Sequence, residues 1–197
     1  MSMSNDIGRL KEVLQREDTI LFVGSGISTW SKLPTWEEMM YRLAEFCQRE
    51  GKNDELVRQE IDRGNLLQAA SYGYDELTSE QRGRFIQATY HNSAKPHEIH
   101  EKLVSLGPTC FITTNYDDLL EQALRNLGKT SVRRCMNNGE TEMARIVHTS
   151  AKNFLFKPHG DADDSSSIVL TRTQYRNLMP HGKLHSAMET LRILLMT

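Results

Sequence analysis

The sequence predicts an α/β protein in which a parallel sheet carries helices on both faces. Short apolar runs, such as residues 20–23 and 109–112, are each followed by polar residues and then by apolar residues at helical spacing. Strand-like and helix-like segments alternate along the chain, which is typical of α/β folds. The 197 residues suffice for one domain with a substantial core and are too few for two comfortable ones.

The N-terminal part of the chain predicts one helix and one strand. Ser4 or Asp6 can cap a helix that runs to about Glu17, and its apolar residues recur at helical spacing. We expect this helix to pack beside the first strand. That strand, residues 19–23, contains a continuous apolar run at residues 20–23, which predicts a strand buried on both faces of a parallel sheet.

A long helical region follows. Thr35 and Glu38 have the spacing of a capping box, and a broad apolar stripe predicts a helix over residues 36–50. Four more helices are predicted near residues 54–63, 66–77, 80–91 and 96–106. This is too much helix for a single crossover between two strands. We therefore expect residues 37–106 to be a helical insertion over the mouth of the active site.

The rest of the chain returns to alternating elements. Strands are predicted at residues 109–112, 131–135, 153–157 and 167–170. Helices are predicted to begin at about residues 119, 171 and 184. Residues 136–150 show no clear pattern.

Composition excludes several classes of protein. The chain has 24 Lys and Arg against 26 Asp and Glu, a net charge of −2, with no block of like charge. Neither a nucleic acid nor a membrane surface is therefore expected as partner. Cys47, Cys110 and Cys135 are far apart without a CxxC pair, which favours a reducing cytoplasm over a disulfide framework or zinc site. No apolar run is long enough to span a bilayer.

A pair of histidines one helical turn apart, His97 and His100, has a spacing that can bind metal. A third ligand is not evident nearby. The pair follows Pro96, where a helix is predicted to begin. A capping or solvent-exposed role is therefore favoured about four to one over metal binding.

Two glycines, Gly24 and Gly26, come directly after the first predicted strand. Glycines there can allow an unusual φ, bring backbone N–H groups close to a ligand and leave room for a diphosphate. A tight strand-to-helix turn explains them equally well, because the third glycine of the dinucleotide fingerprint is absent.

Polar residues also follow two other predicted strands. Asn115 and Asp117 come after residues 109–112, where open α/β sheets bind ligands, although both types also cap helices. His159 and Gly160 follow residues 153–157. A histidine in a turn is more often satisfied by hydrogen bonds than catalytic.

These segments, taken in order, resemble the sirtuins. Residues 24–28 are similar to the opening NAD-binding motif of that family, and residues 113–117 resemble the motif that places a catalytic Asn and a supporting Asp beside the nicotinamide ribose. The His159-Gly160 pair resembles the family's catalytic histidine. Residues that resemble the sirtuin-like NAD hydrolases of prokaryotic anti-phage defence are Pro34, Trp36, Thr171 and Tyr175.

The resemblance spans most of the chain and implies a Rossmann-like domain that takes NAD as its substrate. It implies that Asn115 orients the ribose and a water, that Asp117 supports Asn115, and that His159 acts as general base. The implied NAD-binding residues are Gly24, Ser25, Gly26, Ile27, Ser28, Trp36, Thr114 and Gly160. No metal is expected, because three scattered cysteines cannot supply the four-cysteine zinc module of classical sirtuins.

The implied activity is hydrolysis of the nicotinamide–ribose bond, which yields nicotinamide and ADP-ribose or its cyclic form and depletes NAD during infection. Regulation through a homo-oligomer, a fused sensor domain or a partner is implied as well. The alternatives are a module that binds NAD or ADP-ribose without turnover, and a deacylase or ADP-ribosyltransferase. The family has a further buried strand and a Gly- and Ser-containing loop after this point, so the domain of residues 1–197 is expected to be incomplete at its C-terminus.

Overall fold

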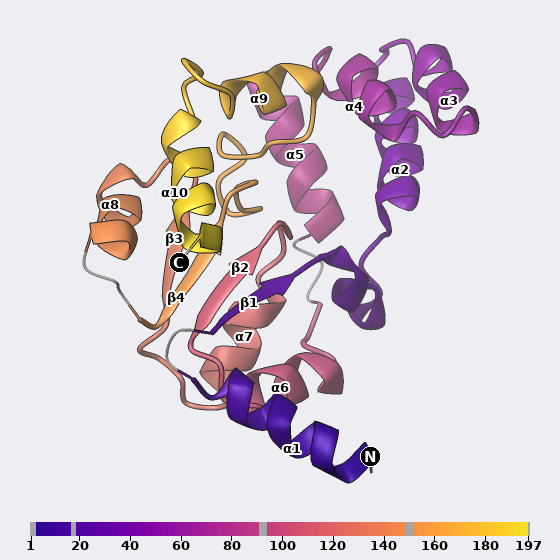
Figure 1. The fold of residues 1–197 in the computed structure, drawn as a ribbon. Helices are drawn as coiled ribbons and strands as arrows, with labels where there is room; N and C mark the ends of the chain where they lie inside the picture. The colour runs from indigo at the N-terminus through magenta and orange to yellow at the C-terminus, as the bar shows by residue number, and fades with distance from the viewer. Residues whose placement is uncertain (1–2, 17–18, 91–93, 149–151, 197) are drawn as a thin grey trace.

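The centre of the molecule is a parallel sheet of four strands in the order β1-β2-β4-β3 (Figure 1). The computed structural model describes residues 3–16, 19–90, 94–148 and 152–196. Its strands are β1 (Ile20–Val23), β2 (Cys110–Thr113), β3 (Arg133–Met136) and β4 (Phe154–Lys157). The predicted α/β class is confirmed. Because the strands are parallel, the turns that follow β1, β2 and β4 lie at the same edge of the sheet.

Helices cover both faces of this sheet, as predicted. Ile112 and Phe156 are register partners and point to one face, while Phe111 and Leu155 are partners on the other. The first face is covered by α8 (Glu140–His148), α9 (Arg172–Asn177) and α10 (His185–Met196). The second is covered by α6 (Glu98–Ser105) and α7 (Leu119–Asn126).

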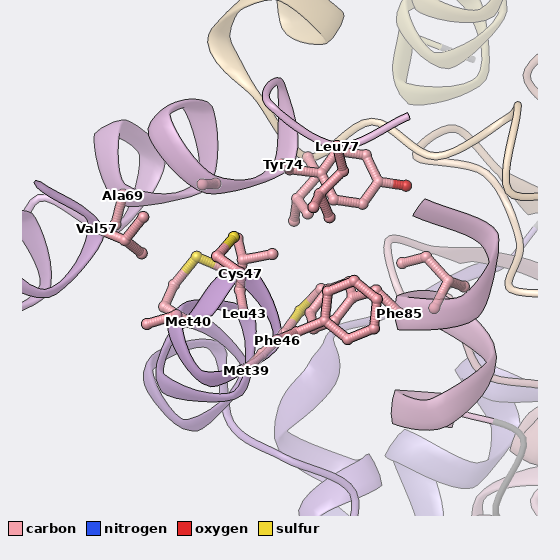
Figure 2. Close-up of a cluster of buried hydrophobic side chains, with 14 of the residues drawn as sticks. Met39, Met40, Leu43, Phe46, Cys47, Val57, Ala69, Tyr74, Leu77 and Phe85 are labelled. Carbon is pink, nitrogen blue, oxygen red and sulfur yellow. The ribbon is translucent and has the colours of Figure 1, made fainter. Parts of the chain in front are cut away.

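Four helices between β1 and β2 build a separate hydrophobic cluster. They are α2 (Trp36–Arg49), α3 (Glu55–Asp62), α4 (Leu66–Tyr74) and α5 (Ser79–Tyr90). Figure 2 shows the side chains of Met39, Leu43, Phe46, Tyr74 and Phe85 meeting inside it. In Figure 1, α5 stands between α2–α4 and the strands. The buried cluster also includes residues that follow β2 and β4, namely Tyr116, Ala162, Ile168 and Leu170.

The start of α2 agrees with the predicted capping box. The Thr35 hydroxyl accepts a hydrogen bond from the Glu38 backbone N–H at 3.2 Å, and the Glu38 carboxylate accepts one from the Thr35 N–H at 2.7 Å. Two N–H groups that the helix itself leaves without partners are thereby satisfied.

Two predictions about strands are wrong. β1 is not buried on both faces, because it lies at an edge of the sheet and Phe22 is 50% exposed. Residues 167–170 do not form a strand. They are buried, which explains their apolar character, but they run as a loop whose Val169 N–H donates to the His159 carbonyl at 2.9 Å.

The first helix and two connecting segments also differ from expectation. α1 (Met3–Leu14) already includes positions 4 and 6, at which it was expected to begin, and its apolar residues Leu10 and Val13 are 57% and 48% exposed. Residues 25–31 form a 3-10 helix, η1 (Ser25–Ser31), instead of a polar loop. α8 occupies the segment for which no pattern was clear. No helix among the described residues is long and apolar enough to cross a membrane.

Candidate active site

A cavity of about 230 Å³ lies where the segments after β1, β2 and β4 meet. The helical cluster contributes its opposite wall. The residues that line it are Ser25, Ser28, Leu33, Pro34, Thr35, Trp36, Met39, Tyr90, Thr114, Asn115, Tyr116, Asp117, His159 and Tyr175. The structure thus brings together residues that are up to 150 positions apart in the sequence.

Most of the predicted site residues belong to this lining. All three of the predicted catalytic residues, Asn115, Asp117 and His159, line the cavity. The predicted NAD-binding residues that do so are Ser25, Ser28, Trp36 and Thr114. Those outside the lining are Gly24, Gly26, Ile27 and Gly160.

Asn115 is buried and its amide is held from two sides. Its Nδ2 donates to the Gly24 carbonyl at 3.2 Å and to the Ser28 hydroxyl at 3.0 Å. Both Nδ2 hydrogens are therefore used within the protein. Its Oδ1 is also buried, yet it has no hydrogen-bond partner among the described residues. A buried carbonyl oxygen without a partner is rare, and here it leaves an acceptor available to a bound water or ligand hydroxyl.

Asp117 is linked to Asn115 through Ser28. The Ser28 hydroxyl accepts from Asn115 and donates to Asp117 Oδ2 at 2.8 Å. The other carboxylate oxygen of Asp117 accepts from the backbone N–H of Leu119 in the first turn of α7 at 3.2 Å. The Asp117 side chain therefore binds the first turn of the helix, the structural role considered from the sequence, and also holds the Ser28 hydroxyl that contacts Asn115.

Thr113 connects this turn to β1 and was not singled out from the sequence. Its hydroxyl donates to the Val23 carbonyl at 2.9 Å and accepts from the backbone N–H of Asn115 at 3.1 Å. A threonine at the end of a strand predicts no specific contact. The two hydrogen bonds of this hydroxyl depend on the pairing of β2 with β1, which the sequence does not specify.

His159 lies two residues beyond β4. Its ring packs edge-on against Tyr175 of α9, with ring centroids 5.3 Å apart and planes at 85°. The ring nitrogens have no hydrogen-bond partner among the described residues, and burial lowers the pKa of the imidazole below its usual value of 6.5. A neutral histidine with an available ring nitrogen can accept a proton near neutral pH.

The structure requires glycine at position 160 but not at positions 24 and 26. Gly24 is extended, with φ −103°, and a Cβ at Gly24 or Gly26 would meet no atom within 4 Å. The expected unusual φ is therefore wrong for Gly24, and the space in front of both residues is open. Gly160 has φ +89°, and a Cβ there would lie 2.2 Å from the Ser167 carbonyl oxygen. The backbone conformation and the neighbouring loop thus both require glycine at 160.

Aromatic and apolar side chains form the rest of the wall. Tyr90 comes from the end of α5 and donates to the Met39 sulfur at 3.1 Å, and Tyr116 donates to the Val169 carbonyl at 2.8 Å. Met39 also belongs to the hydrophobic cluster of the helices. Sequence periodicity cannot identify Tyr90 as a wall residue, because only tertiary packing brings α5 to the cavity. No lysine or arginine of the described residues lines the cavity.

The histidine pair has the capping role that was favoured. His97 is the N-cap of α6, and its Nδ1 accepts from the Ile99 N–H at 3.3 Å. His100 is buried, and burial lowers its pKa. Within the described ranges no three His, Cys, Asp or Glu side chains converge in a way that could hold a metal ion.

The chain is similar to known proteins across most of its length. Residues 109–197 match the model of the SIR2-like domain. The chain is 28% identical over 175 residues, 86% of its length, to the NAD(+) hydrolase ThsA of Enterococcus faecium. It is 26% identical over 181 residues to the protein of that name from Acinetobacter baumannii. It is 25% identical over 185 residues to Defense-associated sirtuin 2 of Bacillus subtilis.

The aligned regions are a minor part of these relatives. The chain spans 33% and 34% of the length of the two hydrolases and 17% of the length of the defence-associated sirtuin. The chain therefore matches the SIR2-like domain over residues 109–197 and is distantly homologous, over most of its length, to ThsA NAD(+) hydrolases and to a defence-associated sirtuin.

Proposed function

We propose that this chain is an NAD hydrolase that cleaves the bond between nicotinamide and ribose. The observation that supports it best is one cavity holding both Asn115, whose Oδ1 lacks a partner, and His159, whose ring nitrogens lack partners. The distant similarity to NAD(+) hydrolases agrees with this chemistry. By the same similarity, we propose that the activity serves anti-phage defence through depletion of NAD.

The reaction requires a sugar to be held, positive charge to be stabilised and a water to be aimed. The C1′–N bond breaks, and its electron pair stays on the nicotinamide nitrogen, so the leaving group departs neutral and needs no acid. The ribose develops oxocarbenium character, as in glycoside hydrolysis generally. Water then bonds to C1′ and loses a proton. We assign that proton to His159, and we assign to Asn115 Oδ1 the hydrogen bond that orients the water or a ribose hydroxyl.

Substrate binding is assigned to the loop after β1 and to the apolar wall. Gly24, Ser25 and Gly26 leave open space in which backbone N–H groups can approach a diphosphate. Trp36 and Tyr90 provide apolar surface suited to the flat nicotinamide ring. We also propose that the helical segment 37–106 serves as a cover for this cavity, since α2 and α5 contribute lining residues.

A time course of NAD consumption tests the proposal. The chain in its natural form should release nicotinamide and a ribose-containing product in equal amounts, identified by mass spectrometry. Asn115→Ala should lower kcat by about a hundredfold. Asn126→Ala, which alters an exposed asparagine on α7, serves as the matched control and should keep kcat within about twofold.

Three other outcomes would contradict either hydrolysis or the role of Asn115. Saturable NAD binding without nicotinamide release would favour a binding module. Release that depends on an added protein acceptor would favour a transferase or deacylase. Turnover that survives Asn115→Ala would remove Asn115 from the reaction.

The pH dependence follows from the lowered pKa of His159. A general base must be neutral, so activity should be constant above the usual histidine range and fall as pH decreases through a pKa below 6.5. The measurement is kcat/KM from about pH 5 to pH 8. The acid limb should be absent from the residual activity of His159→Gln. An acid limb that persists unchanged in that variant would assign the titration to another group.

A further inference from the structure

Lys157 is the last residue of β4 and lies two positions before His159. Its side chain is completely buried, with 0% exposure. An ammonium group is costly to bury unless it is paired and hydrogen-bonded, whereas methionine would fill a similar volume without that cost. The proposed chemistry assigns no role to this charge, so its contacts indicate what it contributes.

The Lys157 ammonium joins the two segments that carry the candidate catalytic residues. Its Nζ donates to the backbone carbonyl of Asp117 at 2.7 Å and approaches the Tyr116 carbonyl at 3.5 Å. These carbonyls belong to the turn that begins with Asn115. The same Nζ pairs with the carboxylate of Asp161, two residues beyond His159, at 2.7 Å.

Further contacts hold this connection in place. A carboxylate oxygen of Glu121 in α7 lies 3.2 Å from Nζ. Burial alone would lower the pKa of Lys157, but the carboxylates of Glu121 and Asp161 outweigh burial and raise this pKa. Arg134 of β3 binds the carboxylate of Asp161 at 3.0 Å. The Ala162 N–H donates to the Tyr116 carbonyl at 2.9 Å. The ammonium therefore remains charged and lies at the centre of the junction between the two segments.

We propose that Lys157 is a positioning residue that fixes the separation of Asn115 and His159 across the cavity. The expected loss of kcat rests on the proposed NAD cleavage. The expected effect of Lys157 on the positions of Asn115 and His159 does not. A water held between an acceptor and a base reacts only when both are correctly placed, and a displacement of about 1 Å can cost on the order of a hundredfold in rate. Loss of the bridge should therefore act on kcat more than on KM.

The test compares Lys157→Met with the double variant Lys157→Met/Asp161→Asn. The single variant leaves the buried carboxylates of Asp161 and Glu121 without the ammonium, and among the described residues only Asp161 keeps a cationic partner, Arg134, so the fold is expected to be destabilised. The double variant removes the charge of Asp161 and should recover part of the lost thermal stability. We expect kcat for NAD to stay at least tenfold below that of the parent chain in the double variant, with KM changed less than threefold.

Lys129→Met is the matched control. Lys129 also donates from its Nζ to two backbone carbonyls, those of Val104 at 2.8 Å and Pro108 at 3.5 Å, but the segment that these carbonyls belong to contributes no residue to the cavity lining. Its replacement should leave kcat within about twofold. A comparable loss of kcat in Lys129→Met would show that any lost lysine bridge impairs the fold, and would overturn the specific role of Lys157.

A second readout separates this inference from the proposed function. The side-chain amide protons of Asn115, which donate to Gly24 and Ser28, should be protected from solvent exchange in the parent chain and lose protection in the double variant, as measured by NMR. Protection and kcat that both stay at the parent level would overturn the inference. Loss of protection in a chain that never turns over NAD would support the positioning role and reject the hydrolase instead.

Discussion

Replacement of His159 by alanine is expected to lower kcat for NAD cleavage by about a hundredfold or more. The ring lines the cavity together with residues of the β2 turn, its nitrogens have no hydrogen-bond partner among the described residues, and burial lowers its pKa below 6.5, which favours the neutral form. Alanine removes the group that accepts the proton of the attacking water. The measurement is initial-rate kinetics with quantified nicotinamide, performed on the chain in its natural form.

The control for this experiment is another histidine. His148 is exposed on α8, and His148→Ala should keep kcat within about twofold. His159→Gln is informative beside alanine, because glutamine keeps polar atoms in a similar volume but cannot accept a proton at neutral pH. Equal kcat values for His159→Gln and the parent chain would exclude proton transfer to this residue and leave it only a packing role against Tyr175.

Much of the candidate site could be predicted because it lies in short segments next to buried strands. The apolar runs of β2 and β4 locate two strand ends, and parallel pairing brings their following turns to one edge of the sheet. Asn115 and His159 are separated by 44 positions, yet the register of Ile112 with Phe156 places their turns side by side. The apolar runs and the parallel pairing of the strands were therefore sufficient to predict that the turns with Asn115 and His159 lie together.

The rest depends on contacts that a single sequence does not encode locally. An apolar run such as 20–23 looks the same in an edge strand and in a central one, because strand order is decided by tertiary pairing. Tyr90 reaches the cavity only because α5 lies between α2–α4 and the strands. In the sequence, Lys157 is an ordinary charged residue at the end of a strand, and only its burial and contacts reveal the bridge between two segments.

Gly160→Ala is expected to be the most damaging small substitution in the molecule. Alanine at φ +89° carries backbone strain, and its Cβ would lie 2.2 Å from the backbone oxygen of Ser167, which cannot move without its loop. Strain and overpacking together should lower the free energy of unfolding by about 3 kcal/mol or more. For a chain of this size that corresponds to a melting temperature lower by roughly 6–12 °C, measurable by differential scanning calorimetry.

The matched control is Gly26→Ala. A Cβ at Gly26 meets no atom within 4 Å and its φ is not left-handed, so the melting temperature should change by less than about 2 °C. The proposed diphosphate cradle predicts instead that KM for NAD rises about tenfold, because the added methyl group occupies space that the substrate needs. An unchanged KM would contradict the cradle.

The Gly160→Ala and Gly26→Ala variants distinguish a glycine that folding requires from a glycine that substrate binding requires. At Gly160 the protein itself fills the space, so the loss should appear in folding and then in catalysis, because the displaced backbone carries His159 on one side and Asp161 on the other. At Gly26 the space is empty in the folded chain, so any loss should appear only when substrate binds. If both variants melt like the parent chain, the close contact between Gly160 and Ser167 relaxes at little cost, and the position of His159 would have to be fixed by other contacts, including those of Lys157.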